Sequence, residues 1–125
     1  MPFFKLENYN LVTNKSIINN GTLSIINGVN TDVSITSSVS NTLFDNNGDL
    51  SITGVKIHGD DLISTGEDHT ISISNSILEG NSIIAAGQDT GVVIMNSNIT
   101  STGQAINTSG ILTIRNSSIV GNTYG

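Results

Sequence analysis

The 125-residue sequence predicts an all-β fold in which the chain winds as a solenoid of about five coils, each of 18–21 residues. The first observation behind this is composition: Ile, Leu and Val supply 35 residues and Asn, Ser, Thr and Gly supply 61, whereas Ala occurs three times. Such residues favour short strands joined by turns, and they exclude an all-α or a doubly wound α/β fold. The second observation is an internal repeat of about 20 residues.

The repeat places three short apolar strands in each coil. Four successive coils carry an isoleucine at the same position of the first strand, at nearly constant spacing: Ile52, Ile73, Ile94 and Ile114. A second apolar position follows in each coil, at Ile57, Leu78, Ile99 and Ile119. A third follows in the first three of these coils, at Ile63, Ile84 and Ile106. Because no helical period fits this spacing, we expect each column to point inward and to stack along the solenoid.

A polar column accompanies the first strand. Shortly after the repeated isoleucine lie Asn75, Asn96 and Asn116, each followed directly by a serine. Stacked strands are about 4.8 Å apart, and an amide side chain can donate and accept hydrogen bonds at once. The three asparagines therefore predict a structural ladder that satisfies polar groups at a buried bend. Gly54 takes the same place one coil earlier, so the ladder should end there.

Residues 73–80, 94–99 and 114–121 carry the most regular form of this repeat. They resemble the repeats of right-handed parallel β-helices, a family that includes pectate-lyase-like proteins, phage tailspikes and bacterial adhesins. The resemblance covers about residues 22–125 and implies a right-handed parallel β-helix, or β-solenoid. That fold serves lyases, hydrolases, isomerases and scaffolds alike, so the resemblance does not select an activity.

The repeat is less regular before residue 50. Residues 33–35, Val39 and residues 43–44 predict a shorter coil of about 18 residues, and residues 23–26 predict one more strand. Residues 1–20 depart from the pattern and hold three of the five aromatic residues. The predicted organisation is therefore an N-terminal cap or docking arm, residues 1–20, followed by a β-helix domain, residues 21–125.

The two ends of the chain are the candidate partner-binding elements. Phe3, Phe4, Leu6 and Tyr9 are the apolar and aromatic residues that we expect to bind a partner, since such residues carry much of the energy of interfaces. The alternative is a cap folded over the first coil. At the other end no polar cap follows Ile119, which predicts that another subunit closes this end or that the chain is a fragment.

Charge and composition exclude several function classes. With a formal net charge of −6 and four Lys and Arg residues, the chain lacks the basic surface that nucleic acid or an anionic membrane requires. The absence of cysteine excludes disulfides, thiolate metal sites and a cysteine nucleophile. No apolar run is long enough to span a bilayer, and no signal peptide is apparent. We expect no cofactor.

Acidic side chains are the candidate catalytic groups. Asp68 stacks with Asp89 on the repeat, and the resemblance implies that enzymes on this fold use two or three acidic residues on one face. The competing interpretation is a solvated turn, where aspartate bonds its own backbone. Because the one arginine, Arg115, lies two coils from Asp68 and no long loop is present to build a cleft, we expect no catalytic residue.

Metal ligands are similarly sparse. Residues 45–49 and 58–61 hold oxygen ligands of the kind that calcium prefers, but neither segment matches a known calcium-binding loop. His58 is expected to stack with Glu79, while His69 lies on another side of the coil, so the two histidines predict no zinc site. We expect no bound metal.

These observations favour a non-enzymatic structural or assembly protein. Its resemblance to phage β-helices implies a virion location, as a spike, fibre or capsid decoration subunit that forms a homo-oligomer, with three-fold symmetry by analogy, and contacts capsid or tail proteins. One alternative is an extracellular or cell-surface β-helix that binds or cleaves carbohydrate, since polar faces suit glycan hydroxyls. Another is a self-polymerising cytoskeletal β-helix, whose end-to-end stack would not close.

Overall fold

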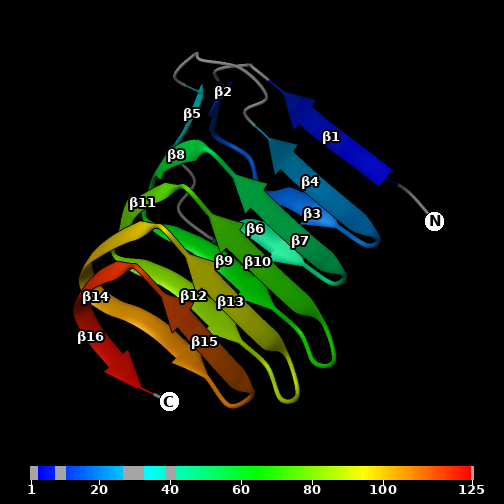
Figure 1. Cartoon of the computed structure of the whole chain (residues 1–125). Coiled ribbons are helices and arrows are strands. Elements are labelled where there is room, and N and C mark those ends of the chain that lie inside the picture. Colours follow the sequence, from blue (N-terminus) through cyan, green and yellow to red (C-terminus); the bar gives the residue numbers. More distant parts are fainter. Residues whose placement is uncertain (1–2, 8–10, 27–32, 39–41, 125) are drawn as a thin grey trace.

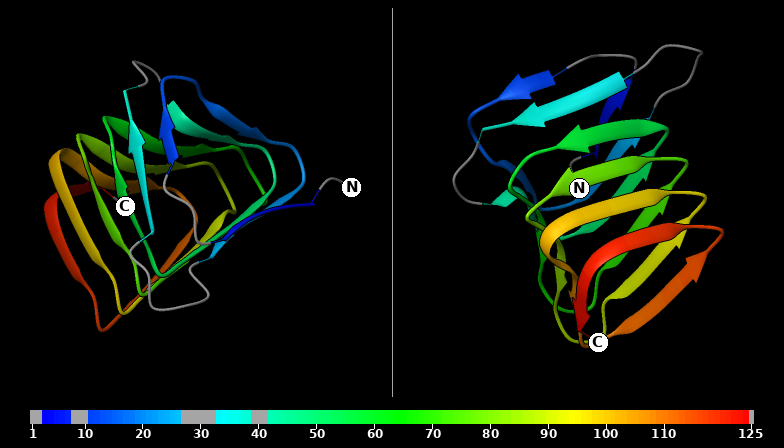
Figure 2. Two further views of the ribbon diagram at one scale, coloured as in Figure 1. Left: turned by 90° about the horizontal axis from the view of Figure 1, so that it is seen from above. Right: turned by 90° about the vertical axis from the view of Figure 1, so that its left-hand side faces the viewer.

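The computed structural model describes residues 3–7, 11–26, 33–38 and 42–124, and every regular element in them is a β-strand. The strands wind into a three-sided solenoid of about five turns (Figures 1 and 2). Neighbouring strands on each side pair in parallel, and the chain forms the right-handed parallel β-helix that the sequence predicts. In these residues no helix is long and apolar enough to cross a membrane.

Three faces make up the solenoid, and we number them in the order in which the chain reaches them. The first face is a six-stranded sheet of β1 (Phe3–Glu7), β4 (Thr22–Ile26), β7 (Asp49–Thr53), β10 (Thr70–Ser74), β13 (Gly91–Met95) and β15 (Ile111–Arg115). The second face holds β2 (Leu11–Thr13), β5 (Val33–Ser37), β8 (Val55–His58), β11 (Ile77–Gly80) and the first parts of β14 (Asn98–Thr108) and β16 (Ser118–Tyr124). The third face holds β3 (Ile17–Asn19), β6 (Thr42–Asn46), β9 (Asp61–Thr65), β12 (Ser82–Ala86) and the remainders of β14 and β16.

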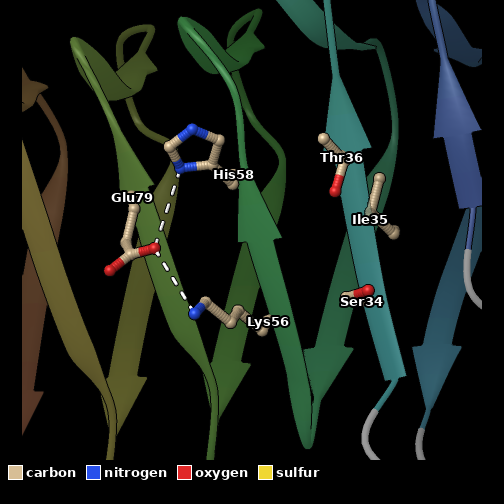
Figure 3. A pocket seen from close by; sticks show the side chains of 6 residues that line it. All are labelled: Ser34, Ile35, Thr36, Lys56, His58 and Glu79. Atoms are coloured by element: carbon tan, nitrogen blue, oxygen red, sulfur yellow. Dashed lines mark ion pairs between the residues drawn. The ribbon is translucent and has the colours of Figure 1, made fainter.

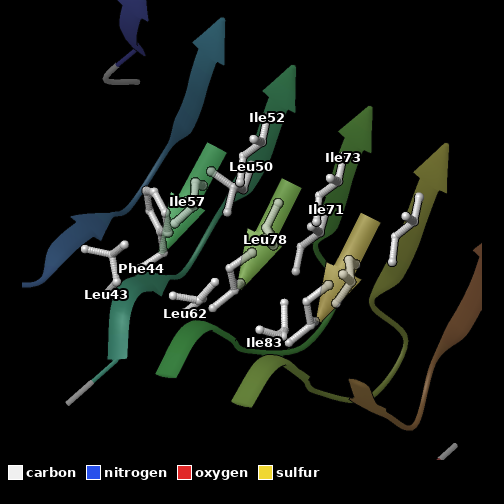
Figure 4. Packing of buried hydrophobic residues seen from close by; sticks show 14 of the residues in the cluster. Leu43, Phe44, Leu50, Ile52, Ile57, Leu62, Ile71, Ile73, Leu78 and Ile83 are labelled. Atoms are coloured by element: carbon white, nitrogen blue, oxygen red, sulfur yellow. The ribbon is translucent and has the colours of Figure 1, made fainter. Parts of the chain in front are cut away.

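The inward columns stack as the repeat predicts. Ile52, Ile73 and Ile94 are register partners on the first face, and all three are fully buried. Figure 4 shows Ile52 and Ile73 on neighbouring strands. Ile57, Leu78 and Ile99 form the equivalent buried column on the second face. Ile114 also keeps the predicted register, but it is exposed because β15 is the last strand of its sheet and no described strand covers it.

The turn that begins with β4 is longer than the sequence suggests. Leu23 pairs with Leu50, which is a longer step along the chain than the one from Leu50 to its next partner, Ile71. Apolar and polar residues alternate at 33–35 as they do in a first-face strand. The sequence therefore predicts that a new, short coil begins there. In the structure Ile35 pairs with Ile57, so β5 belongs to the second face. The other residue assigned to that coil, Val39, lies outside the described residues.

The N-terminal segment continues the solenoid. β1, β2 and β3 lie one on each face and pair with β4, β5 and β6. Phe4 is the register partner of Leu23, a step close to that of the later turns, so the repeat length holds here as well. Residues 3–7, 11–13 and 17–19 are therefore strands of the first turn, and a role of this turn as a cap or docking arm stays a prediction. The sequence does not reveal this because the Asn-Ser pair that marks the repeat is absent from the segment.

Candidate functional site

The predicted asparagine column lies at the corner between the first and second faces. Asn75, Asn96 and Asn116 occupy equivalent places there, and their φ angles of 51°, 51° and 49° are left-handed. Gly54, with a φ of 71°, takes the same place one turn earlier. Asparagine and glycine are the residues that adopt this conformation at least cost. The three asparagine side chains are exposed, so the corner selects them for their backbone rather than for a buried amide ladder.

The hydrogen-bonded column at this corner is formed by the serine that follows each asparagine. The hydroxyl of Ser76 accepts a bond from the backbone N–H of Val55 (3.2 Å), and that of Ser97 accepts one from Ser76 (3.2 Å). The hydroxyl of Ser117 accepts one from the backbone N–H of Ser97 (3.1 Å). Ser76 and Ser97 are buried. The ladder that the sequence predicts therefore lies one residue further along the chain.

Ser97→Ala and Asn96→Gly separate these two columns. Ser97→Ala leaves the buried N–H of Ser76 without its acceptor, so we expect the free energy of unfolding to fall by about 1–3 kcal/mol. Asn96→Gly removes the amide but keeps a residue that accepts a left-handed φ, so we expect a change of at most about 0.5 kcal/mol. Urea melts measure both, and an equal loss in Asn96→Gly would show that the amide contributes after all.

A buried amide ladder does exist, at the corner between the third and first faces. Asn19 and Asn46 are buried, and the Asn19 amide donates to Oδ1 of Asn46 at 2.7 Å. The Asn46 amide donates in turn to Oγ1 of Thr65 at 3.0 Å and to the carbonyl of Gly48 at 2.8 Å. The sequence carries a signal for this ladder, because Asn-Asn-Gly occurs at both residues 19–21 and 46–48.

Asp68 and Asp89, the candidate carboxylates, lie one turn apart at another part of this same corner. Both have left-handed φ angles, 60° and 59°, and both are exposed. They line an open hollow of about 600 Å³ together with His69 and Ser109. Among the described residues neither carboxylate has a hydrogen bond or an ion pair. Their left-handed conformation and exposure are those of turn aspartates, but the bond to their own backbone that the solvated-turn interpretation expects is absent from the described residues.

A second hollow, of about 300 Å³, lies on the second face and contains an ionic cluster (Figure 3). Glu79 Oε1 is 3.7 Å from His58 Nδ1 and 3.8 Å from Lys56 Nζ. The predicted stacking of His58 with Glu79 is thus confirmed, whereas Lys56 was not anticipated. All three side chains are substantially exposed, so these pairs contribute at most about 1 kcal/mol to stability. Ser34, Ile35 and Thr36 of the neighbouring strand complete the lining of this hollow.

The segments considered for calcium have other roles in the structure. Asn46 is committed to the buried ladder, and a carboxylate oxygen of Asp49 accepts the backbone N–H of Thr70 at 3.1 Å. Within the described part of the chain, no three His, Asp or Glu side chains gather closely enough to hold a metal ion.

Large exposed apolar side chains concentrate at the two ends of the solenoid. Of the six in the described residues, five lie in the first or the last turn: Val12 (80% exposed), Ile18 (63%), Ile111 (75%), Ile114 (42%) and Val120 (56%). The sixth, Ile77, lies in the middle of the second face. Of the predicted partner-binding residues, Phe3, Phe4 and Leu6 belong to β1, the edge strand of the first face, and Tyr9 lies outside the described residues.

Comparison with known proteins does not place the chain in a family. No family model matches it, and no similar curated protein or solved structure was found. Function is therefore inferred from the molecule's own surface.

Proposed function

We propose that this chain is a non-enzymatic structural protein whose β-solenoid associates with further copies of itself. The observation that carries the proposal is a set of large apolar side chains that stay exposed on the described strands: Val12, Ile18, Ile77, Ile111, Ile114 and Val120. Exposed apolar residues that gather on a surface are typical of interaction sites. The role proposed is a building unit whose repeated coils form a rigid body.

The edge strands support the same proposal. β1 and β15 are the two outermost strands of the first face, so each presents a row of backbone groups to an incoming strand. β15 has a neighbouring described strand, β13, on one side only. Ile114 is therefore exposed, whereas Ile94 of β13 is fully buried. A further coil placed on this end would bury that apolar surface and pair the edge at once.

The sides of the solenoid offer less for association. In the middle turns the outward positions of the second face include Lys56, His58, Glu79 and Thr100, and these side chains are charged or polar. The trimer implied by the resemblance would use these sides, where Ile77 is the one large exposed apolar residue in the middle turns of the described chain.

The proposed setting is a spike or fibre on a virion, with capsid or tail proteins as further partners, and it is supported by the resemblance alone. The non-enzymatic role is supported by the environment of Asp68 and Asp89, which are solvated turn residues in an open hollow. A catalytic pair of carboxylates would need a fixed separation around a bound substrate.

Light scattering of the purified chain over a hundredfold range of concentration tests the proposal. We expect the mean mass to rise well above 13.0 kDa as concentration increases, because association between copies is governed by mass action. Electron microscopy of the same samples should show particles of constant width. A chain that stays monomeric at every concentration would contradict the proposal.

A further inference from the structure

We infer that the hollow on the second face is a binding site for a small oxyanion, which is a sulfate, phosphate or carboxylate group, held by Lys56, His58 and Thr36. The partner of this site is a ligand and not a second copy, so the site is independent of the self-association proposed above. Three outward side chains on two neighbouring strands supply its hydrogen-bond donors.

The strand register brings these side chains together. Ser34 and Thr36 of β5 are the register partners of Lys56 and His58 of β8. Because alternate residues of a strand face the same way, all four stand on the outward side of the second face, while Ile35 between two of them is buried. Short side chains on β5 beside longer ones on β8 leave the hollow of about 300 Å³ (Figure 3).

Lys56, His58 and Thr36 carry donors that the described chain does not use. The one described partner of Lys56 Nζ and His58 Nδ1 is Glu79 Oε1, at 3.8 and 3.7 Å, and both distances are beyond the range of a hydrogen bond. The hydroxyl of Thr36 is exposed and likewise makes no hydrogen bond within the described residues. An oxyanion can accept several such bonds at once, and those from charged donors are the strongest.

Glu79 lies behind the two cationic side chains. It belongs to β11, which pairs with β8 on the side opposite to β5. Its carboxylate therefore approaches Lys56 and His58 from the side away from Thr36 (Figure 3). The carboxylate holds both cationic groups beside the hollow, but its negative charge also opposes a bound anion. Removal of that charge should therefore strengthen binding.

The charge around this hollow differs from that of the rest of the described surface. With a formal net charge of −6, the chain as a whole repels anions. Two other hollows are lined by aspartates without a lysine or an arginine: Asp68 and Asp89 in one, and Asp45 in the other. At the second-face hollow Lys56 balances Glu79, and protonation of His58 leaves a positive charge. An anion is therefore expected here rather than at the aspartate-lined hollows.

Nuclear magnetic resonance titrations of the isotope-labelled chain test the site. The probes are sodium sulfate, sodium phosphate and sodium acetate, each compared with sodium chloride at equal ionic strength. We expect saturable shifts of the backbone amides of Thr36 and His58, with a dissociation constant on the order of 1 mM. Sodium glucuronate distinguishes the source of the group: tighter binding than acetate indicates the acid group of a sugar, and binding no tighter than acetate indicates a free ion.

Three charge-removing variants assign the roles. Lys56→Gln removes a charged donor and should raise the dissociation constant about tenfold. Glu79→Gln removes the opposing charge and should lower it about threefold. Lys15→Gln is the matched control for Lys56→Gln, because Lys15 is an exposed lysine that does not line the hollow, and it should leave the constant unchanged. Thermal melts verify that each variant folds.

Wild-type chain without saturable shifts would overturn the site. Equal weakening by Lys56→Gln and Lys15→Gln would do the same, since it would reflect the overall charge alone. Weaker binding in Glu79→Gln would overturn the opposing role assigned to this carboxylate. A chain that associates with itself but binds no anion overturns only the site, whereas one that binds the anion and stays monomeric overturns only the proposed function.

Discussion

Phe44→Ala should lower the free energy of unfolding by about 3–5 kcal/mol. Phe44 is buried on the third face (Figure 4). Its register partners on the two neighbouring strands are Ile17 and Ile63. Removal of the ring leaves a cavity in the middle of a column, and the strands on either side are held in place by their ladders. Urea unfolding followed by circular dichroism at low concentration measures the loss.

Ile77→Ala is the matched control, since Ile77 is a large apolar residue that points outward. Its loss should be below about 1 kcal/mol. Because each turn contacts only its neighbours, we also expect hydrogen exchange in Phe44→Ala to increase first in the strands of the N-terminal turns. A uniform increase over all turns would show that the solenoid unfolds as one cooperative unit instead.

Gly48→Ala should be nearly as damaging, with a loss of about 3 kcal/mol. A Cβ atom at Gly48 would overlap the carbonyl oxygen of Gly21 in the turn above. That oxygen accepts the backbone N–H of Asp49 at 2.9 Å, so moving it disturbs a hydrogen bond between turns. The same corner holds the Asn19–Asn46 ladder, which leaves little freedom for the backbone to adjust.

Gly91→Ala provides the control for Gly48→Ala. Gly91 begins a first-face strand beside this corner, but a Cβ atom there would meet nothing within 4 Å. We therefore expect Gly91→Ala to be neutral or to stabilise by up to about 1 kcal/mol, because alanine reduces the freedom of the unfolded chain. Equal melting temperatures for the two variants would contradict the close approach of the turns at Gly48.

The inward columns could be predicted because burial imposes a strict period on the sequence. Ile52, Ile73 and Ile94 recur at the turn length, so a solenoid of that turn length stacks them in one column and buries all three. The register before residue 50 was harder to predict, because Val33–Ser37 has the alternation of any strand and nothing in it specifies the face. Only the pairing of Ile35 with Ile57 decides that question.

The corner residues show a second limit of prediction from spacing. A repeat identifies a column at residues 75–76, 96–97 and 116–117, but it does not say which of the two neighbours points inward. A left-handed residue interrupts the alternation of the strand, so Asn96 turns outward and Ser97 turns inward. Asp68 and Asp89 also adopt the left-handed conformation, which aspartate tolerates better than most residues, so their place at a turn agrees with the sequence, whereas the expected bond to their own backbone is absent from the described residues.

The long turn between β4 and β7 has a consequence for how this protein can be modified. The strand register of that turn matches the others, although six residues separate β4 from β5 and only one separates β7 from β8. The number of residues that connect the strands at this corner can therefore differ between turns while the strand register stays the same. Natural insertions and engineered peptide grafts should be accepted between Ile26 and Val33, which makes this corner the place where the scaffold could acquire new binding loops.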